Sequence, residues 1–192
     1  PRYSLKGVQK KGEGFDCSIE GPESKMLSVS KVLVSERRPN TAHLGLEQAG
    51  VTLKDGGAID IDDRLRAGQK GIYAIGDAIG GWMLSHASSA AAVVAAENTM
   101  GSSRTFTHHL VPRGLWSFLE VGAVGLSEEE AENEGKDVKV GDFPYSINGL
   151  AMSYGETTGA VKVISDARLG EILGVHIVGS RATELIGEAV TA

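Results

Sequence analysis

Three short stretches near the start of the chain alternate between apolar and polar residues: 5–10, 15–19 and 29–34. Turn-forming residues occupy 11–14 and 21–24, between these stretches. Alternation with a period of two predicts strands, and short turns rich in glycine or proline join strands that run antiparallel. The first part of the chain is therefore predicted to be a β-meander.

The second half of the chain shows the same kind of pattern with helices added. Residues 111–124 predict a strand, a turn and a strand, and residues 159–164 and 172–179 alternate around a turn, which predicts a hairpin. Ser127 and Glu130 form a capping box, which predicts the start of a helix. The order of strand, helix, strands and helix predicts an antiparallel sheet with helices on one side.

The last residues of the chain, 182–192, have apolar side chains at helical spacing. This spacing predicts an amphipathic helix that faces a core. No cap or breaker follows that helix, and the first residue is a proline, so we expect the chain to be a piece of a longer protein.

The middle of the chain carries an apolar run, residues 71–75, that ends in Gly76-Asp77. The run predicts a buried strand that places the carboxylate of Asp77 at the carboxyl edge of a sheet, where α/β folds bind ligands. A carboxylate at this edge accepts hydrogen bonds from sugar-like hydroxyls and repels a bare phosphate. The alternative is a turn in which Gly76 and Asp77 only end the strand or cap the next helix.

An alanine-rich helix follows this run. It is predicted to span residues 80–100, with Gly101 at its end. Its first turn has unpaired N–H groups and a partial positive charge, which favour an electron-rich carbonyl or an anionic ring edge. Taken alone, Met83 and Leu84 also suit an ordinary core, and His86 suits a partly buried histidine with a hydrogen-bond partner.

Composition excludes some functions. The 192 residues are 41% apolar and 23% charged, as in an ordinary soluble globular protein, and the net charge of −6 argues against a nucleic-acid partner. The sequence has no apolar run of about 18 residues, which a membrane span would need, and no signal peptide, which secretion would need. We therefore expect a cytoplasmic protein. Cys17 is expected to be a small half-buried side chain. No metal site is predicted, because His108 and His109 are adjacent and point to opposite sides of an extended chain.

Several of these stretches together resemble one family. Residues 71–80 resemble the second flavin-binding motif of flavoproteins with two dinucleotide-binding domains. The segment from Met83 resembles the Met-Leu-Ala-His-x-Ala motif of the dihydrolipoamide dehydrogenases, with Ser85 in place of alanine. Residues 121–131 and 172–179 resemble the dimerisation domain of the same enzymes. The resemblance covers nearly the whole chain.

The resemblance implies a fold that combines the α/β and α+β classes. The C-terminal part of a FAD/NAD(P)-binding Rossmann-like domain would be followed by an α+β dimerisation domain, an antiparallel sheet plus helices. Residues 1–38 would end the NAD-binding domain, residues 39–106 would end the FAD-binding domain, and residues 107–192 would form a dimerisation domain truncated at its C-terminus.

The resemblance also implies a cofactor site and partners. Asp77 would bind the ribityl part of FAD, and the helix start would lie under the pyrimidine side of the flavin. The parent enzyme would oxidise dihydrolipoyl groups with FAD and NAD. It would act as a homodimer and serve a lipoyl domain or E2 core of a 2-oxo acid dehydrogenase complex, or glycine cleavage. The implied cofactor-binding residues are Gly76, Asp77, Met83, Leu84, Ser85 and His86.

Parts of this chemistry are missing from the sequence. It has no Gly-x-Gly-x-x-Gly turn and no cysteine pair, and the family's His-Glu pair would follow the last helix, so we expect no catalytic residue and no activity in this chain alone. Glu36 and Leu119 differ from the local sequence that the family has at these positions. Glu36 puts contact with NAD in doubt, and Leu119 puts one fixed turn in doubt. The alternatives are another flavin disulfide oxidoreductase, of the mercuric or glutathione reductase type, and a non-catalytic homodimerisation or flavin-associated module.

Overall fold

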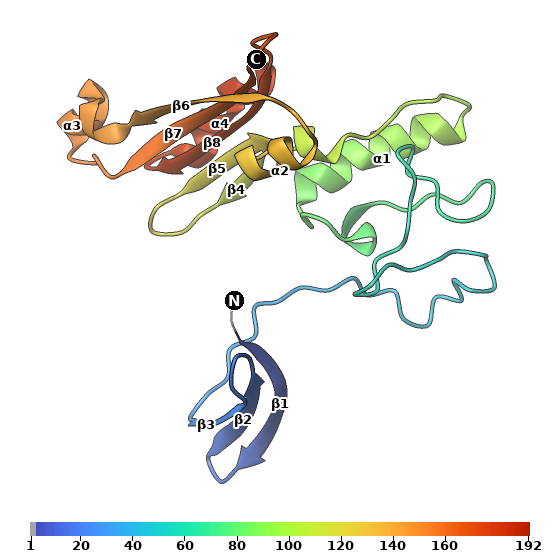
Figure 1. Cartoon of the computed structure of the whole chain (residues 1–192). Helices are drawn as coiled ribbons and strands as arrows, with labels where there is room; N and C mark the ends of the chain where they lie inside the picture. Colours follow the sequence, from blue (N-terminus) through green and yellow to red (C-terminus); the bar gives the residue numbers. More distant parts are fainter. Residues whose placement is uncertain (1–2) are drawn as a thin grey trace. The chain divides into compact units, whose positions relative to one another are not determined.

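The computed structural model describes residues 3–192 (Figure 1). The chain divides into two compact units, one that ends at Arg37 and one from Arg38 to Ala192. Among the described residues, no helix is both long and apolar enough to cross a membrane.

The first unit is an antiparallel meander in the order β1 (Ser4–Lys11), β2 (Gly14–Glu20) and β3 (Lys25–Val29). The central strand β2 buries Cys17, which is more deeply buried than the half-buried position predicted for it. The predicted meander is therefore confirmed.

The third strand of this meander differs from the prediction. It begins at Lys25, directly after the turn, and ends at Val29, where the predicted stretch 29–34 would have begun. The turn at 21–24 is short, so pairing with β2 starts at once, and the side chain of Ser28 donates a 2.5 Å hydrogen bond to Asp16. Beyond this strand Leu33 is 93% exposed, because no neighbouring strand pairs with the apolar residues there.

The second unit contains a five-stranded antiparallel sheet. Its strands are β4 (Arg113–Leu115), β5 (Val121–Gly125), β6 (Val138–Pro144), β7 (Gly159–Asp166) and β8 (Ile172–Gly179), in the order β4-β5-β8-β7-β6. The predicted hairpin is β7 and β8, which pair from Gly159 to Ser165. The strand β6 was not predicted, although its alternating residues pair with β7 along its whole length.

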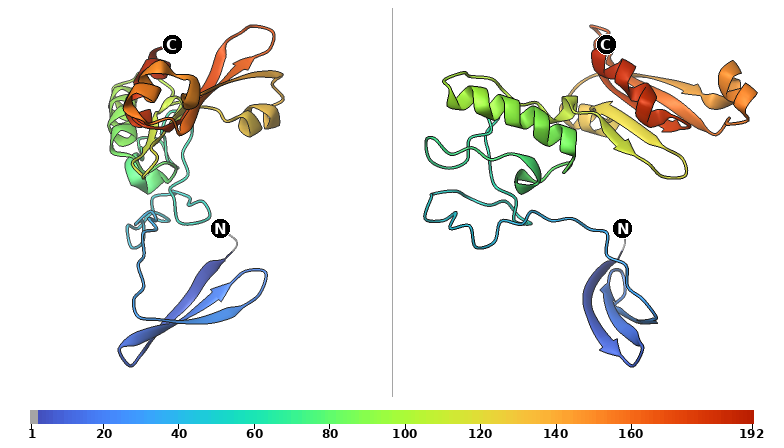
Figure 2. Two further views of the ribbon diagram at one scale, coloured as in Figure 1. Left: turned by 90° about the vertical axis from the view of Figure 1, so that its left-hand side faces the viewer. Right: turned by 180° about the vertical axis from the view of Figure 1, so that it is seen from behind.

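Two helices pack on this sheet, on opposite faces. In β7, Val163 packs against the core cluster that contains Ala182 and Ile186 of the helix α4 (Ala182–Thr191), whereas its neighbour Ile164 packs with Ala131 of the helix α2 (Glu128–Asn133). Adjacent residues of a strand point to opposite faces, so the prediction of helices on one side is wrong. Figure 2 gives two further views, with α2 in gold and α4 in red. A third helix, α3 (Gly149–Tyr154), follows β6 and the short 3-10 turn η3 (Tyr145–Ile147).

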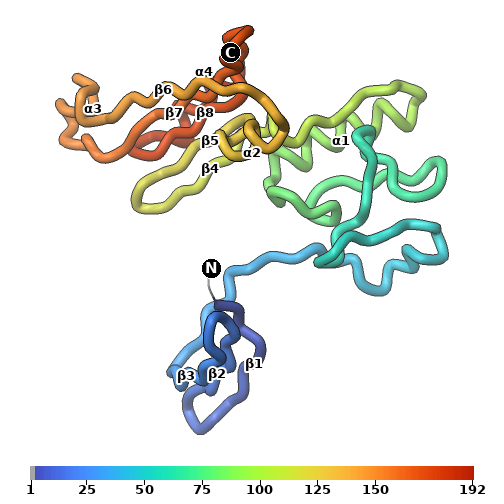
Figure 3. Tube along the Cα trace, in the orientation of Figure 1, coloured from blue at the N-terminus to red at the C-terminus, as the bar shows by residue number. Residues whose placement is uncertain are grey.

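The stretch that precedes the sheet contains little regular structure until the helix α1 (Ser85–Thr99) (Figure 3). The predicted strand 71–75 is not formed. Its one β contact among the described residues is an isolated bridge between Tyr73 and Arg66, and the 3-10 turn η1 (Gly76–Ile79) follows directly. A strand needs a neighbour to form a ladder, and this stretch has only one bridge.

The helix α1 matches the predicted helix, although it begins at Ser85, later than predicted. Its buried face carries small and β-branched residues that pack on Leu65, whose side chain is fully buried. Its C-terminal end is tied to the surrounding loops by Asn98, whose side chain bonds the main chain of Arg64 and Arg104 at 2.8–3.1 Å. The alanines on the buried face, Ala91 and Ala95, allow the helix to approach Leu65 closely.

Candidate functional site

The two segments predicted to bind a cofactor meet at a small cavity. Gly76 and Ile79 of η1 line it, together with Leu84, Ala87 and Ser88 from the start of α1. Its volume is about 10 Å³, room for one water molecule at most. The two segments therefore pack against each other around this cavity, and a larger ligand would lie on the surface beside it.

The start of α1 is open. The residue before the helix, Leu84, is extended at φ −109° and ψ 138°, and its apolar side chain makes no capping hydrogen bond. The first N–H to find an acceptor is that of Ser88, which donates to the carbonyl of Leu84 at 3.0 Å. Within the described part of the chain, the N–H groups of residues 85–87 have no acceptor. Together with the helix dipole they can donate to an anionic or electron-rich group.

The structure divides the predicted site residues into two groups. Gly76, Met83 and Leu84 line the cavity, whereas Asp77, Ser85 and His86 are exposed and do not line it. Gly76, the first residue of η1, and Met83, which follows η1, both have positive φ angles, 70° and 48°, so the chain turns sharply at the start of η1 and again before α1. For methionine this left-handed conformation is strained, and such strain persists where the surroundings hold it.

Comparison with known proteins identifies the family. Residues 2–92 match the pyridine nucleotide-disulphide oxidoreductase family, and residues 111–192 match the dimerisation domain of that family. The chain belongs to the pyridine nucleotide-disulphide oxidoreductases. The fold class implied by the sequence resemblance is therefore confirmed, with the antiparallel sheet of the second unit inside the matched dimerisation domain.

Curated relatives in this family are named dihydrolipoyl dehydrogenase. The enzyme of Thermus scotoductus is 40% identical over 190 residues, which cover 97% of this chain and 41% of that protein. The enzyme of Corynebacterium glutamicum is 40% identical over 201 residues, which cover 100% of the chain and 43% of that protein. The pig mitochondrial enzyme is 36% identical over 97% of the chain and 38% of its own length. The chain thus spans about two fifths of the length of these relatives.

Solved structures share the fold. LpdA from Mycobacterium tuberculosis superimposes with a TM-score of 0.83 at 24% identity, over 98% of this chain and 41% of that chain. The HOCl-induced flavoprotein disulfide reductase RclA from Escherichia coli gives a TM-score of 0.73 at 25% identity, over 98% and 43%. At these identities the likeness to LpdA supports the fold alone.

In this member of the family the ring of His86 already has a hydrogen-bond partner. Its Nε2 lies 2.6 Å from the carbonyl oxygen of Pro112, so Nε2 carries the hydrogen and donates it. Pro112 directly precedes β4 of the antiparallel sheet. Any contact of His86 with a cofactor would therefore come from its main chain, whose N–H is one of the open groups at the start of α1.

Sequence reasoning missed several residues of the site. Trp82, Phe106 and His108 also line the cavity, and the rings of Phe106 and His108 meet edge to face with centroids 4.7 Å apart. Partial burial of the His108 imidazole lowers its pKa, and the nearby charge of Lys54 lowers that pKa further, so the ring is neutral at neutral pH. Trp82 could have been predicted from the sequence, because it directly precedes Met83. Nothing local in the sequence indicated Phe106 or His108.

Metal ligation has no support among residues 3–192. No group of three histidine, cysteine, aspartate or glutamate side chains there could hold a metal ion. Cys17 is buried in the meander of the first unit. The candidate site is the open helix start with the exposed carboxylate of Asp77, which can donate and accept hydrogen bonds respectively.

Proposed function

We propose that the protein to which this chain belongs is a dihydrolipoyl dehydrogenase that uses FAD and NAD. The curated relatives that carry this name are 36–43% identical to the chain. Because the chain covers about two fifths of them, the activity is proposed for the whole protein. The sequence has a single cysteine, so a dithiol–disulfide exchange needs residues outside it, and the chain alone is proposed to be inactive.

The observation that carries this proposal is the uncapped start of α1 beside Gly76-Asp77. An exposed carboxylate and a set of open N–H groups suit a ligand with hydroxyls at one end and electron-rich carbonyls at the other. A flavin with its ribityl chain is such a ligand, so the residues present fit the group. When bound, FAD would supply the electron transfer between dithiol and nicotinamide.

The residues of the chain would then have separate binding roles. The carboxylate of Asp77 would accept hydrogen bonds from ribityl hydroxyls. The N–H groups of Ser85, His86 and Ala87 would donate to the pyrimidine edge and stabilise negative charge on the reduced ring. Gly76, Met83 and Leu84 would shape the turn that holds these groups beside one another.

We also propose that the protein is a homodimer joined through residues 111–192. The match to the family's dimerisation domain supports this, as does a cavity of about 230 Å³ bordered by half-exposed apolar side chains, including Phe143, Leu150 and Leu185. A lipoyl domain or E2 core as the further partner, and a cytoplasmic location, complete the proposal and rest on the family alone. Sedimentation at about 10 µM that shows only monomer of the full-length protein would contradict the dimer.

The test of function uses the full-length protein. We expect the purified protein to show flavin absorbance and to oxidise dihydrolipoamide with reduction of NAD. The change Asp77→Ala removes a charged acceptor, and hydrogen bonds to a charged group are worth about 1.5–3 kcal/mol, so flavin release should become easier by at least about tenfold. Activity with oxidised glutathione or mercuric ion in place of lipoamide would favour the alternative reductases.

A matched control is Asp55→Ala. Asp55 is an exposed carboxylate in the same unit, outside η1 and α1, and its loss should leave flavin binding unchanged. A full-length protein without flavin, or an Asp77→Ala variant that retains it as well as wild type, would overturn the assignment of this segment. The first of these outcomes would also leave a flavin-free dimerisation module as the remaining function.

A further inference from the structure

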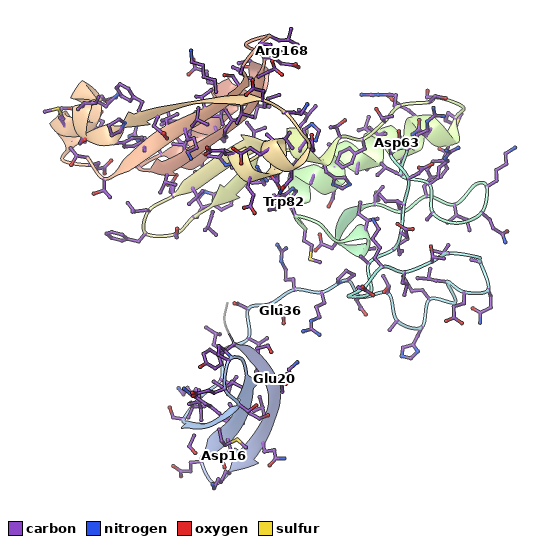
Figure 4. All side chains as sticks on the ribbon, viewed as in Figure 1. Asp16, Glu20, Glu36, Asp63, Trp82 and Arg168 are labelled. Carbon is purple, nitrogen blue, oxygen red and sulfur yellow. The ribbon has the colours of Figure 1, made fainter. Side chains whose placement is uncertain are left out.

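Two consecutive residues before and in β4 contact the segment that opens α1. The guanidinium carbon of Arg113 lies 4.3 Å from the ring centroid of Trp82, and the carbonyl of Pro112 accepts the 2.6 Å hydrogen bond from His86. Figure 4 labels Trp82 at the start of α1. The two contacts hold both sides of the left-handed turn at Met83.

Arg113 is fixed by the sheet as well as by the ring. Its backbone pairs with Ala123 of β5, and its Nη2 donates to the carbonyl of Gly125 at 2.8 Å. Its Nε is buried and has no partner among the described residues. Burial lowers the pKa of this guanidinium, and the charge of Glu130 opposes that shift. The side chain is therefore held in one place between the sheet and Trp82.

The indole face of Trp82 compensates part of the free-energy cost of burying this cation. A guanidinium over an indole face is attracted by the ring quadrupole, more strongly where water is excluded. Lysine cannot replace it, because an ammonium does not lie flat on the ring and cannot reach the carbonyl of Gly125 in the same fork geometry. The contact therefore depends on the shape of arginine as well as on its charge.

We propose that Arg113 is a positioning residue for the flavin. By stacking on Trp82, with Pro112 holding His86, it fixes the open N–H groups of residues 85–87 relative to the antiparallel sheet. This inference rests on the proposed flavin site at the start of α1. It predicts that removing the contact weakens flavin binding while Asp77 and the N–H groups of residues 85–87, the groups proposed to contact flavin, are all retained.

The first test measures the contact in the 192-residue chain without any flavin. Trp116 is 73% exposed, so Trp116→Phe leaves Trp82 as the one fluorescent indole of the chain. In this background Arg113→Met should shift the emission of Trp82, whereas Arg181→Met should not. Arg181 is the matched control, since it lies 5.7 Å from the ring of Tyr154 in the same unit. Unchanged emission in Arg113→Met would overturn the contact itself.

The second test measures flavin in the full-length protein. Arg113→Met and Trp82→Leu should each raise the dissociation constant for flavin about tenfold, and the double variant should be no worse than either single one. Trp82→Phe, which keeps a ring under the guanidinium, should restore most of the affinity. Arg181→Met should bind flavin as wild type does. If Arg113→Met fails to fold, Trp82→Leu tests the same contact from its other side.

The two possible failures are distinguishable. Absence of flavin in the wild-type full-length protein would contradict the proposed function, whatever the emission of Trp82 shows. Flavin in wild type that is retained equally by Arg113→Met and Trp82→Leu would contradict the positioning role alone. Additive losses in the double variant would also contradict it, because two residues that act through one contact cannot lose it twice.

Discussion

The two halves of the second unit begin their helices in opposite ways. In the sheet half, α2 starts with a complete capping box: Ser127 accepts from the N–H of Glu130, and the carboxylate of Glu130 accepts from the N–H of Ser127 at 2.8 Å. The start of α4 is capped by the carboxylate of Glu120, which accepts hydrogen bonds from the N–H and the hydroxyl of Thr183. In the other half, the longest helix of the described chain, α1, starts with Leu84 and no cap.

This difference distinguishes the sheet half, which is the scaffold, from the half that contains the candidate site. A helix end that is capped by its own chain has fewer donors left for a ligand, and capping contributes about 1 kcal/mol to stability. An end left open forgoes that stability and keeps its N–H groups available. The closed starts lie in the antiparallel sheet half, and the open one lies beside Asp77, where the sequence predicts a cofactor.

The largest effect is expected from Gly122→Ala, which tests how closely the scaffold half is packed. An added Cβ at this position of β5 would lie 2.2 Å from the carbonyl oxygen of Ala182, at the start of α4. The helix would have to move, so we expect a loss of about 3 kcal/mol in the free energy of unfolding, measured with urea. Gly141→Ala in β6, whose Cβ would meet nothing within 4 Å, is the control and should cost less than about 0.5 kcal/mol.

The next effect concerns the far end of α1. Asn98 is 6% exposed and its side chain makes three hydrogen bonds to loop main chain. Asn98→Ala leaves these buried groups without partners, so the free energy of unfolding should fall by about 2 kcal/mol. The exposed neighbour Thr99→Ala should change it by less than about 0.5 kcal/mol. Equal effects at the two positions would mean that the end of α1 is as loosely held as its start.

A serine-to-alanine pair tests the comparison of helix starts directly. Ser127→Ala removes the cap of α2 and should lower the free energy of unfolding by about 1 kcal/mol. Ser85→Ala is the same change in the first turn of α1, where no capping bond exists, and should cost less than about 0.5 kcal/mol. Urea unfolding of both variants measures the difference. A similar loss at Ser85 would show that α1 is capped in solution.

The smallest effect is a change in the acid unfolding of the chain. Thr183 donates to Glu120 from its hydroxyl at 2.7 Å and from its main chain at 3.1 Å, and these bonds lower the pKa of Glu120. A lowered folded pKa contributes stability above the unfolded pKa, and that stability is lost as pH falls through the folded value. Glu120→Gln should therefore flatten the fall in stability at pH values below about 4.5. An unchanged acid profile would contradict a charged cap on α4.

Sequence predicted most of the elements in the sheet half. The capping box, the β7–β8 hairpin and the helix from Ala182 are all present, because each signal acts between residues close in the chain. The prediction of a strand at 71–75 was wrong, since a strand also requires a neighbouring strand, which the local pattern does not specify. The third strand of the meander was misplaced for a related reason, because its register follows the turn before it.

The candidate site was predicted in part. The sequence identified the two segments, Gly76-Asp77 and the start of α1, by motif and spacing, and the structure brings Gly76, Met83 and Leu84 to one cavity. The roles assigned to Asp77, Ser85 and His86 toward a cofactor stay predictions. The partner of the His86 ring, Pro112, lies 26 positions away and could not be foreseen from either motif.

The sequence alone determined the capping box of α2, the β7–β8 hairpin, the helix from Ala182 and the unpaired N–H groups at the start of the alanine-rich helix, since caps, turns and periodicity are local. The tertiary structure decided what lies against them. It placed α2 and α4 on opposite faces of the sheet, brought Glu120 to the start of α4, and set Arg113 on Trp82. These contacts join residues about 20 or more positions apart, and their geometry depends on how whole elements pack, which no window of sequence contains.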